Sequence, residues 1–203
     1  MTKRISFCLL VFLPIYLYSQ NIDIRLLRSI NSPHELASDG FFRFVSNSEV
    51  YIAIGTPVIV ATTGLIKDDR EMVRNAVVIL AGEAITSGLT LAIKYSVNRD
   101  RPYSTYSDIL KKTSGGGPSF PSGHTSSAFA TATSVSLAYP KWYIIVPSFA
   151  WAGTVAYSRM HLGVHYPSDV LAGAVVGAGS AFLTYKINQK LYHKKKIKPC
   201  DCP

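Results

Sequence analysis

The chain has 203 residues, of which 48% are hydrophobic and 16% charged, and its formal net charge is +9. Soluble proteins have about 25% charged residues, so this basic and apolar composition, with a mean hydropathy of +0.19, favours a membrane protein. The basic residues form no stripe with interleaved aromatic residues, which argues against nucleic-acid binding. Three cysteines form no disulfide framework and predict no zinc site.

The first segment joins a basic start, MTKR, to a short apolar run at residues 5–18. This run is shorter than the roughly 20 residues that span a bilayer. Residues 1–19 are therefore either a signal peptide cleaved near Ser19 or a short first membrane helix. Both interpretations place Asn21 beyond the inner membrane. Residues 20–49 are mixed and partly amphipathic, which predicts a surface or interfacial helix.

Five later runs of apolar and small residues predict helices, at residues 50–66, 75–93, 123–139, 142–157 and 170–187. Each run is weak as a membrane span by itself, but Gly, Ala, Ser and Thr suit close helix packing. The sequence therefore predicts an all-α bundle of five to six helices, mostly membrane-spanning. We expect this domain at residues 50–190 and a basic tail at residues 191–203. The alternative is a soluble helical bundle with a secretion signal.

Charge placement predicts the orientation of this bundle. If the first segment crosses outward and later segments alternate, the inner segments are MTKR, KDDREMVR, PKW and the lysine-rich tail. That arrangement agrees with the excess of Lys and Arg in cytoplasmic segments. The loop at residues 94–120 and the turn at residues 158–169 then lie together at the periplasmic face, and residues 191–203 form a cytoplasmic tail.

Three cations in these two outer segments, Lys94, Arg101 and Arg159, suggest a phosphate site. Buried cations are costly without an anion. Arg matches phosphate oxygens with a two-pronged fork, and Lys supplies a point charge. Ser122 and Gly123 stand where a helix is expected to begin, and free N–H groups at a helix start bind anions. Taken alone, Lys94 and Arg101 would be an ordinary pair at a helix end.

Two histidines are suited to the chemistry. His165 and Asp169 lie four residues apart, with Pro167 between them as a suitable first helical residue. The carboxylate can fix the imidazole tautomer and leave the other nitrogen free as a nucleophile. His124 can then protonate the leaving oxygen. His161 has no carboxylate four residues on, and we interpret it as structural.

The motifs K-x6-RP, PSGH and SR-x5-H-x3-D occur in this order. Together they resemble the signatures of the type 2 phosphatidic acid phosphatase (PAP2) superfamily, which includes class A acid phosphatases, lipid phosphate phosphatases and vanadium haloperoxidases. The resemblance extends over about residues 50–187 and does not cover residues 1–49. It implies a metal-free and cofactor-free phosphohistidine mechanism, in which His165 attacks phosphorus, Asp169 orients His165 and His124 protonates the leaving group. The implied phosphate-binding residues are Lys94, Arg101, Ser122, Gly123 and Arg159.

The resulting expectation is a lipid phosphatase of the bacterial inner membrane with its active site facing the periplasm. The resemblance implies undecaprenyl diphosphate, phosphatidylglycerophosphate, phosphatidic acid or a lipid A phosphate as substrate, and vanadate as an inhibitor. Three alternatives stay open: a soluble periplasmic acid phosphatase, a haloperoxidase and a non-catalytic phosphate-binding bundle. The last would need the cations but not His165 with Asp169. Glu83, within an apolar run, is either functional or paired with a neighbouring helix.

Overall fold

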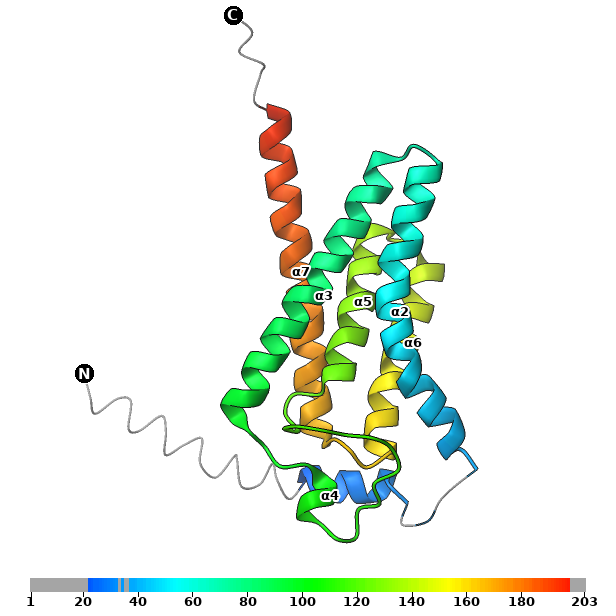
Figure 1. Cartoon of the computed structure of the whole chain (residues 1–203), viewed down its shortest axis with the longest axis vertical. Coiled ribbons are helices and arrows are strands. Elements are labelled where there is room, and N and C mark those ends of the chain that lie inside the picture. Colours follow the sequence, from blue (N-terminus) through cyan, green and yellow to red (C-terminus); the bar gives the residue numbers. More distant parts are fainter. Residues whose placement is uncertain (1–21, 33, 35–36, 198–203) are drawn as a thin grey trace, which may run out of the picture.

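The computed structural model describes residues 22–32, 34 and 37–197, and all regular secondary structure in these ranges is helical. This confirms the predicted all-α bundle (Figure 1). A first helical segment covers residues 22–30. The others are α2 (Asp39–Ile66), α3 (Arg70–Val97), α4 (Pro102–Thr105), α5 (Gly123–Ala138), α6 (Trp142–His161) and α7 (Pro167–Ile197). The signal-peptide or first-helix prediction for residues 1–19 lies outside the described residues.

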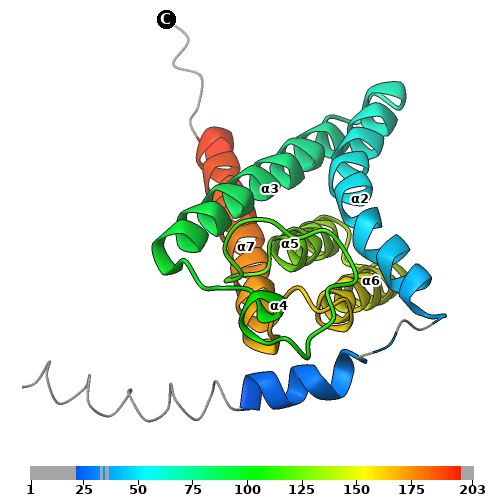
Figure 2. The same ribbon diagram turned by 60° about the horizontal axis from the view of Figure 1, so that its bottom comes forward.

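Helix α5 is the central element of the bundle. It packs against α2, α3, α6 and α7, which lie around it in the tilted view of Figure 2. Its buried side chains are small, and Ala128, Ala130 and Ala132 are all at most 1% exposed. Small side chains let neighbouring helices approach closely in a bundle. The Gly/Ala/Ser/Thr-rich composition of this run is therefore explained by its central position.

The contact between α5 and α7 is the closest example of this packing. A Cβ atom at Gly177 would overlap the carbonyl oxygen of Ser126, and one at Gly173 would lie 2.7 Å from the carbonyl oxygen of Ser122. The two helices also begin side by side, because the backbone N–H of Ser122 donates to the carbonyl oxygen of Asp169 at 3.0 Å. The glycines of α7 thus bring two of the predicted motifs together.

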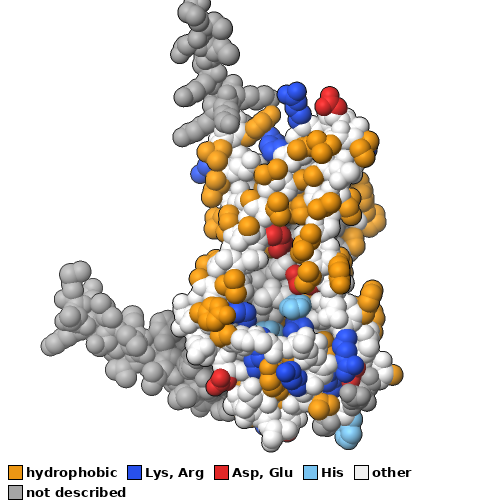
Figure 3. Space-filling model, viewed as in Figure 1, with side chains coloured by type: hydrophobic (Ala, Val, Ile, Leu, Met, Phe, Trp, Pro, Cys, Tyr) orange, Lys and Arg blue, Asp and Glu red, His pale blue; other side chains and the backbone are white. Residues whose placement is uncertain are grey.

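Among the described residues, three stretches are long and apolar enough to cross a membrane: Asp39–Ile66, Arg70–Thr105 and Pro167–Tyr192. They contain α2, α3 and most of α7. Their outward side chains include many exposed large hydrophobic residues, and Figure 3 shows these side chains over the upper part of the bundle. Side chains of this kind suit contact with lipid tails rather than water.

Helices α2 and α7 extend well beyond the apolar runs that predicted them. Helix α2 begins at Asp39 rather than at residue 50, so the expected boundary after residue 49 lies within it. Its first turns bury polar residues that contact other elements, a pattern that an apolar run cannot reveal. Helix α7 continues to Ile197, past the expected boundary after residue 190. Its Tyr192 ring packs under the guanidinium of Arg74 on α3, at 4.0 Å.

The long connection between α3 and α5 is fixed to the rest of the bundle. Within it, Lys112 is buried and its Nζ lies 3.1 Å from the carboxylate of Asp39 at the start of α2. His161, at the end of α6, contacts the same carboxylate through Nε2 at 2.6 Å. The structure therefore gives His161 the structural surroundings expected for it. Asn31 adds hydrogen bonds to the carbonyl oxygens of Leu110 and His161.

We predict that Gly177→Ala lowers the stability of the bundle by about 1–3 kcal/mol, because the added methyl group forces α7 away from α5. The matched control is Gly179→Ala on the same helix, where an added Cβ would have nothing within 4 Å. Thermal unfolding of the detergent-solubilised variants gives the comparison. Equal midpoints for the two variants would contradict the close approach of the helices.

Candidate active site

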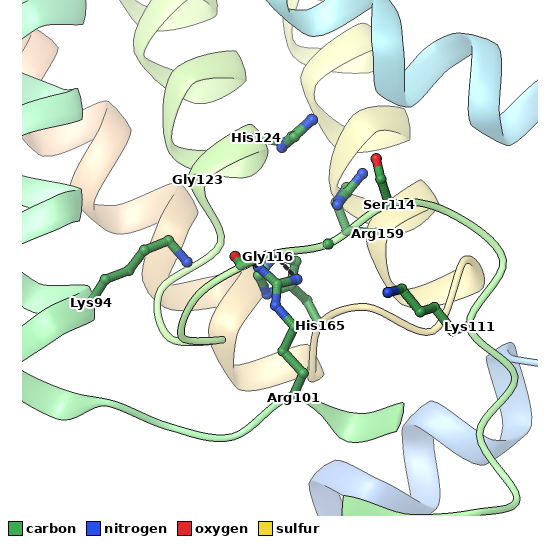
Figure 4. A pocket seen from close by; sticks show the side chains of 10 residues that line it. Lys94, Arg101, Lys111, Ser114, Gly116, Gly123, His124, Arg159 and His165 are labelled. Atoms are coloured by element: carbon green, nitrogen blue, oxygen red, sulfur yellow. Dashed lines mark hydrogen bonds between the residues drawn. The ribbon is translucent and has the colours of Figure 1, made fainter. Parts of the chain in front are cut away.

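A cavity of about 550 Å³ lies at the end of the bundle, between the end of α3, the long connection after it, the start of α5, the end of α6 and the turn before α7. Side chains from these elements converge on it (Figure 4). All of the predicted site residues line this cavity except Ser122 and Asp169, which lie directly behind it. Its lining residues are Lys94, Arg101, Lys111, Ser114, Gly115, Gly116, Gly123, His124, Arg159 and His165.

His165 lies in the turn between α6 and α7 and is 1% exposed. Its Nδ1 is 3.5 Å from a carboxylate oxygen of Asp169, and its Nε2 is 3.4 Å from a guanidinium nitrogen of Arg101. Since a carboxylate can only accept and a guanidinium can only donate, we assign the proton to Nδ1 and the lone pair to Nε2. The side chain of His165 thus lies within reach of Asp169, and the catalytic role of His165 stays a prediction.

The electrostatic surroundings keep this imidazole neutral. Burial lowers the pKa of His165 to about 4, and the positive charges of Arg159 and Arg101 act in the same direction. The hydrogen bond and the charge of Asp169 oppose this effect. A lowered histidine pKa means that the neutral form dominates at every pH well above it. At neutral pH, therefore, Nε2 has an available lone pair.

Asp169 is fully buried and accepts three further hydrogen bonds. Ser119 Oγ donates to it at 2.5 Å, the backbone N–H of Tyr166 at 3.0 Å and Arg99 Nη1 at 2.8 Å. Arg99 also bonds Ser168 Oγ and the carboxylate of Asp23 in the first helical segment. Sequence reasoning missed Ser119 and Arg99. Their only signal was proximity to motif residues, since each lies within three positions of one.

The three predicted cations surround the same space without carboxylate partners. Lys94 Nζ donates to the carbonyl oxygen of Pro118 at 2.7 Å. Arg101 donates to the carbonyl oxygens of loop residues and of Val164. Arg159 donates through one Nη to Ser46 Oγ at 2.5 Å. Over the described ranges, none of the three cations forms a salt bridge. Such a cluster favours an anion in the cavity.

The start of α5 adds backbone donors to these charges. Ser122 is the N-cap and Gly123 the first helical residue, as the PSGH motif predicted. The first N–H groups of a helix have no intrahelical partner and carry the positive end of the helix dipole. A Cβ at Gly123 would meet only the side chain of Lys94, at 4.0 Å. The absence of a side chain here leaves the helix start open to the cavity.

His124, one residue further along α5, lies opposite a carboxylate that the sequence did not single out. Its side chain is 35% exposed, and its Nε2 is 4.0 Å from a carboxylate oxygen of Glu49 on α2. Glu49 itself is 6% exposed. It belongs to the segment predicted as an interfacial helix, so its proximity to the site depends on the packing of α2 against α5. No motif marks it.

Glu83 lies outside the main cavity and is paired. Its carboxylate accepts hydrogen bonds from Thr131 Oγ1 at 2.6 Å and Ser127 Oγ at 2.9 Å, both on α5. This favours the structural alternative of the two that the sequence left open. Across the residues that the structure describes, no group of three or more His, Cys, Asp or Glu side chains is arranged to hold a metal ion.

Several of the known proteins that resemble this chain are named as phosphatases. The chain is 35% identical over 94 residues to a lipid A 4'-phosphatase of Bacteroides thetaiotaomicron, covering 46% of this chain and 42% of the relative. It is 36% identical over 114 residues to a lipid A 1-phosphatase of Porphyromonas gingivalis, covering 55% and 23%. It thus spans less than half the length of these two relatives. An undecaprenyl-diphosphatase of Sulfolobus acidocaldarius is 30% identical over 192 residues, with 88% of each chain covered.

Solved structures share the fold. Aquifex aeolicus LpxE matches with a TM-score of 0.69 and 25% identity, over 81% of this chain and 95% of that one. A transmembrane PAP2-type phosphatidylglycerolphosphate phosphatase from Bacillus subtilis matches in fold with a TM-score of 0.72 and 20% identity, over 94% and 98%. The family model for the PAP2 superfamily matches residues 75–193. With more than half of the chain matched by this model, and a relative aligned over nearly its whole length, the protein belongs to the PAP2 superfamily.

Proposed function

We propose that this protein is a membrane phosphatase that removes a phosphate group from a lipid through a phosphohistidine intermediate. One observation carries the proposal: a buried, neutral His165 is oriented by Asp169 and faces a cavity with three cations that have no carboxylate partners among the described residues. A site built only to hold phosphate would need the cations but not an oriented imidazole.

The proposed reaction has two steps. In the first, His124 acts as an imidazolium. Burial and the surrounding cations lower the pKa of His124 to about 3, and the negative charge of the bound phosphate offsets these cations, so that His124 takes up a proton from solvent when the substrate binds. Nε2 of His165 then attacks phosphorus, the bond between phosphorus and the ester oxygen breaks, and His124 gives its proton to that oxygen. In the second, a water molecule attacks the phosphohistidine, the P–N bond breaks, and His124 takes the proton from the water. The products are the alcohol and inorganic phosphate, and both histidines return to their first state.

Charge stabilisation accompanies both steps. Phosphoryl transfer depends mostly on positioning and on stabilising negative charge at the equatorial oxygens. We assign this role to Lys94, Arg101 and Arg159, together with the backbone N–H of Gly123 at the start of α5. The N–H of Ser122 is already bonded to the carbonyl oxygen of Asp169, so Ser122 contributes as the N-cap that begins this helix. Arg101 is held in place by carbonyl oxygens of the loop at Gly116 and Gly117 and by Val164, so its position does not depend on the substrate.

The three long apolar stretches support a lipid as the substrate. The cavity lies at one end of helices that expose large hydrophobic side chains, so a lipid phosphate can enter it while the tails remain in the bilayer. A soluble acid phosphatase would have no use for this exposed apolar surface. We place the protein in the bacterial inner membrane with the cavity facing the periplasm, because that orientation leaves the lysine-rich end of α7 in the cytoplasm.

The mechanism predicts that His165→Ala lowers kcat by roughly three orders of magnitude or more, since the nucleophile is lost. The matched control is His34→Ala, the same change at an exposed histidine, which should retain activity. A labelled substrate should leave an alkali-stable, acid-labile phosphoenzyme on the wild-type protein and none on His165→Ala. Undiminished phosphate release by that variant would remove the mechanism.

Vanadate should inhibit much more strongly than phosphate. Vanadate adopts the five-coordinate geometry that the transferred phosphoryl group has in the transition state, and enzymes bind such mimics more tightly than ground-state ligands. Inhibition constants for the two anions, measured with the same substrate in detergent, provide the test. Equal and weak inhibition by both would count against a site that stabilises this transition state.

The orientation can be tested with single cysteines. In a background with Cys8, Cys200 and Cys202 changed to serine, we expect Ser107→Cys, near the cavity, to react with a membrane-impermeant reagent in intact spheroplasts. Lys67→Cys, between α2 and α3 at the opposite end of the bundle, should react only after lysis. Both positions are exposed. Reaction of Lys67→Cys alone would reverse the proposed orientation.

A further inference from the structure

A second cavity of about 320 Å³ adjoins the first, between α2, α3 and α5. The two cavities share Lys94, Gly123 and His124, but His165 lines only the first. Figure 3 shows acidic side chains, with a histidine side chain below them, on the face between α2 and α3. The second cavity is lined by Glu49, Thr86, Ser87, Thr90, Leu91, Lys94, Gly123, His124, Ser126 and Ser127.

Several polar side chains line the second cavity, although α2 and α3 beside it are suited to span a membrane. Glu49 is 6% exposed, Thr86 1% and Thr90 4%. The hydroxyl groups of Thr86 and Thr90 are buried and have no hydrogen-bond partner within the described part of the chain. A buried hydroxyl group without a partner is costly, and native structures rarely leave one unexplained. These two hydroxyl groups are explained if a ligand with polar groups fills the cavity.

In the proposed mechanism, the part of the substrate nearest the second cavity is the group attached to the leaving oxygen. The attacking nitrogen and the leaving oxygen lie in line on opposite sides of phosphorus. His165 faces one side, and His124 protonates the oxygen on the other. Because His124 lines both cavities and His165 lines only the first, the group attached to the leaving oxygen extends past His124 into the second cavity.

The carboxylate of Glu49 limits what this leaving group can be. When a diphosphate is cleaved, the leaving group is itself a phosphate, whose negative charge would face Glu49 near His124. Lys94 also lines this cavity and offsets part of the repulsion between the two negative charges. The repulsion that remains selects against a phosphate as the leaving group. An alcohol that carries further hydroxyl or amide groups would instead donate to Glu49, and it could pair with the hydroxyl groups of Thr86 and Thr90.

We propose, on the basis of the proposed phosphatase function, that the second cavity is a leaving-group subsite for a lipid alcohol bearing hydroxyl or amide groups. The natural substrate is then a phosphate monoester of such an alcohol rather than a polyprenyl diphosphate. Both a sugar-based lipid and a glycerol-based one have this chemistry, and the choice of substrates distinguishes them.

The test compares kcat/KM in detergent for four substrates: a lipid A phosphate, phosphatidylglycerophosphate, undecaprenyl diphosphate and p-nitrophenyl phosphate. The wild-type protein should prefer one of the two monoesters to the diphosphate by at least about tenfold. The double variant Thr86→Val/Thr90→Val should lower kcat/KM for that lipid, relative to p-nitrophenyl phosphate, by at least about fivefold, as expected for lost hydrogen bonds. Glu49→Gln should reduce the ratio of kcat/KM for the preferred monoester to kcat/KM for undecaprenyl diphosphate.

Thr133→Val is the matched control, because Thr133 also has a buried hydroxyl group without a partner in the described ranges but lines neither cavity. Thr133→Val should leave the ratios of kcat/KM between the four substrates unchanged. The monoester that responds to the Thr86 and Thr90 changes identifies the alcohol as sugar or glycerol. Unchanged ratios in the double variant, or a wild-type preference for the diphosphate, would overturn the subsite. No hydrolysis of any substrate, p-nitrophenyl phosphate included, would instead overturn the proposed function itself.

Discussion

The buried carboxylate of Asp169 is the point on which the geometry of the site depends. It accepts from Ser119, Arg99 and the backbone of Tyr166 and faces Nδ1 of His165. These contacts join the long connection after α3, the turn after α6 and the start of α7. A buried charge is tolerated only with such partners. The histidine, the loop that lines the cavity and the helix that carries the carboxylate are therefore positioned together.

The buried cations of the site, unlike the carboxylate of Asp169, lack an oppositely charged hydrogen-bond partner among the described residues. Arg159 is 3% exposed and Arg101 7% exposed, and each donates its hydrogen bonds to neutral oxygens rather than to a carboxylate. Their mutual repulsion and desolvation oppose folding, so the bundle retains this arrangement against its own stability. A bound phosphate would relieve the repulsion, and the greater charge that develops in phosphoryl transfer would relieve it further. The cost of assembling the cations is thus recovered at the stage of the reaction where charge is greatest.

Motif spacing predicted the residues that meet at the cavity, because helix starts and helix ends are local features. The PSGH motif placed the start of α5 correctly, and Pro167 is the first residue of α7. Contacts made by tertiary packing left no such signal. Arg99 and Glu49 lie far along the chain from the groups they face, Asp169 and His124. The true start of α2 was hidden for the same reason, since its polar first turns face other elements instead of forming an apolar run.

The two proposed catalytic histidines differ in how firmly they are held. His165 is enclosed by hydrogen-bonded groups that continue through Arg99 to Asp23 in the first helical segment, so the geometry of attack is fixed from several directions. His124 stands on α5 with a cavity on either side and is 35% exposed. The reacting phosphoryl group is common to all phosphate esters, whereas the alcohol differs among lipids. A rigidly held nucleophile, His165, suits the constant phosphoryl group. The open space beside the proposed acid, His124, suits alcohols of different structure. Changes in α2 and α3 can then alter substrate choice without disturbing the chemistry.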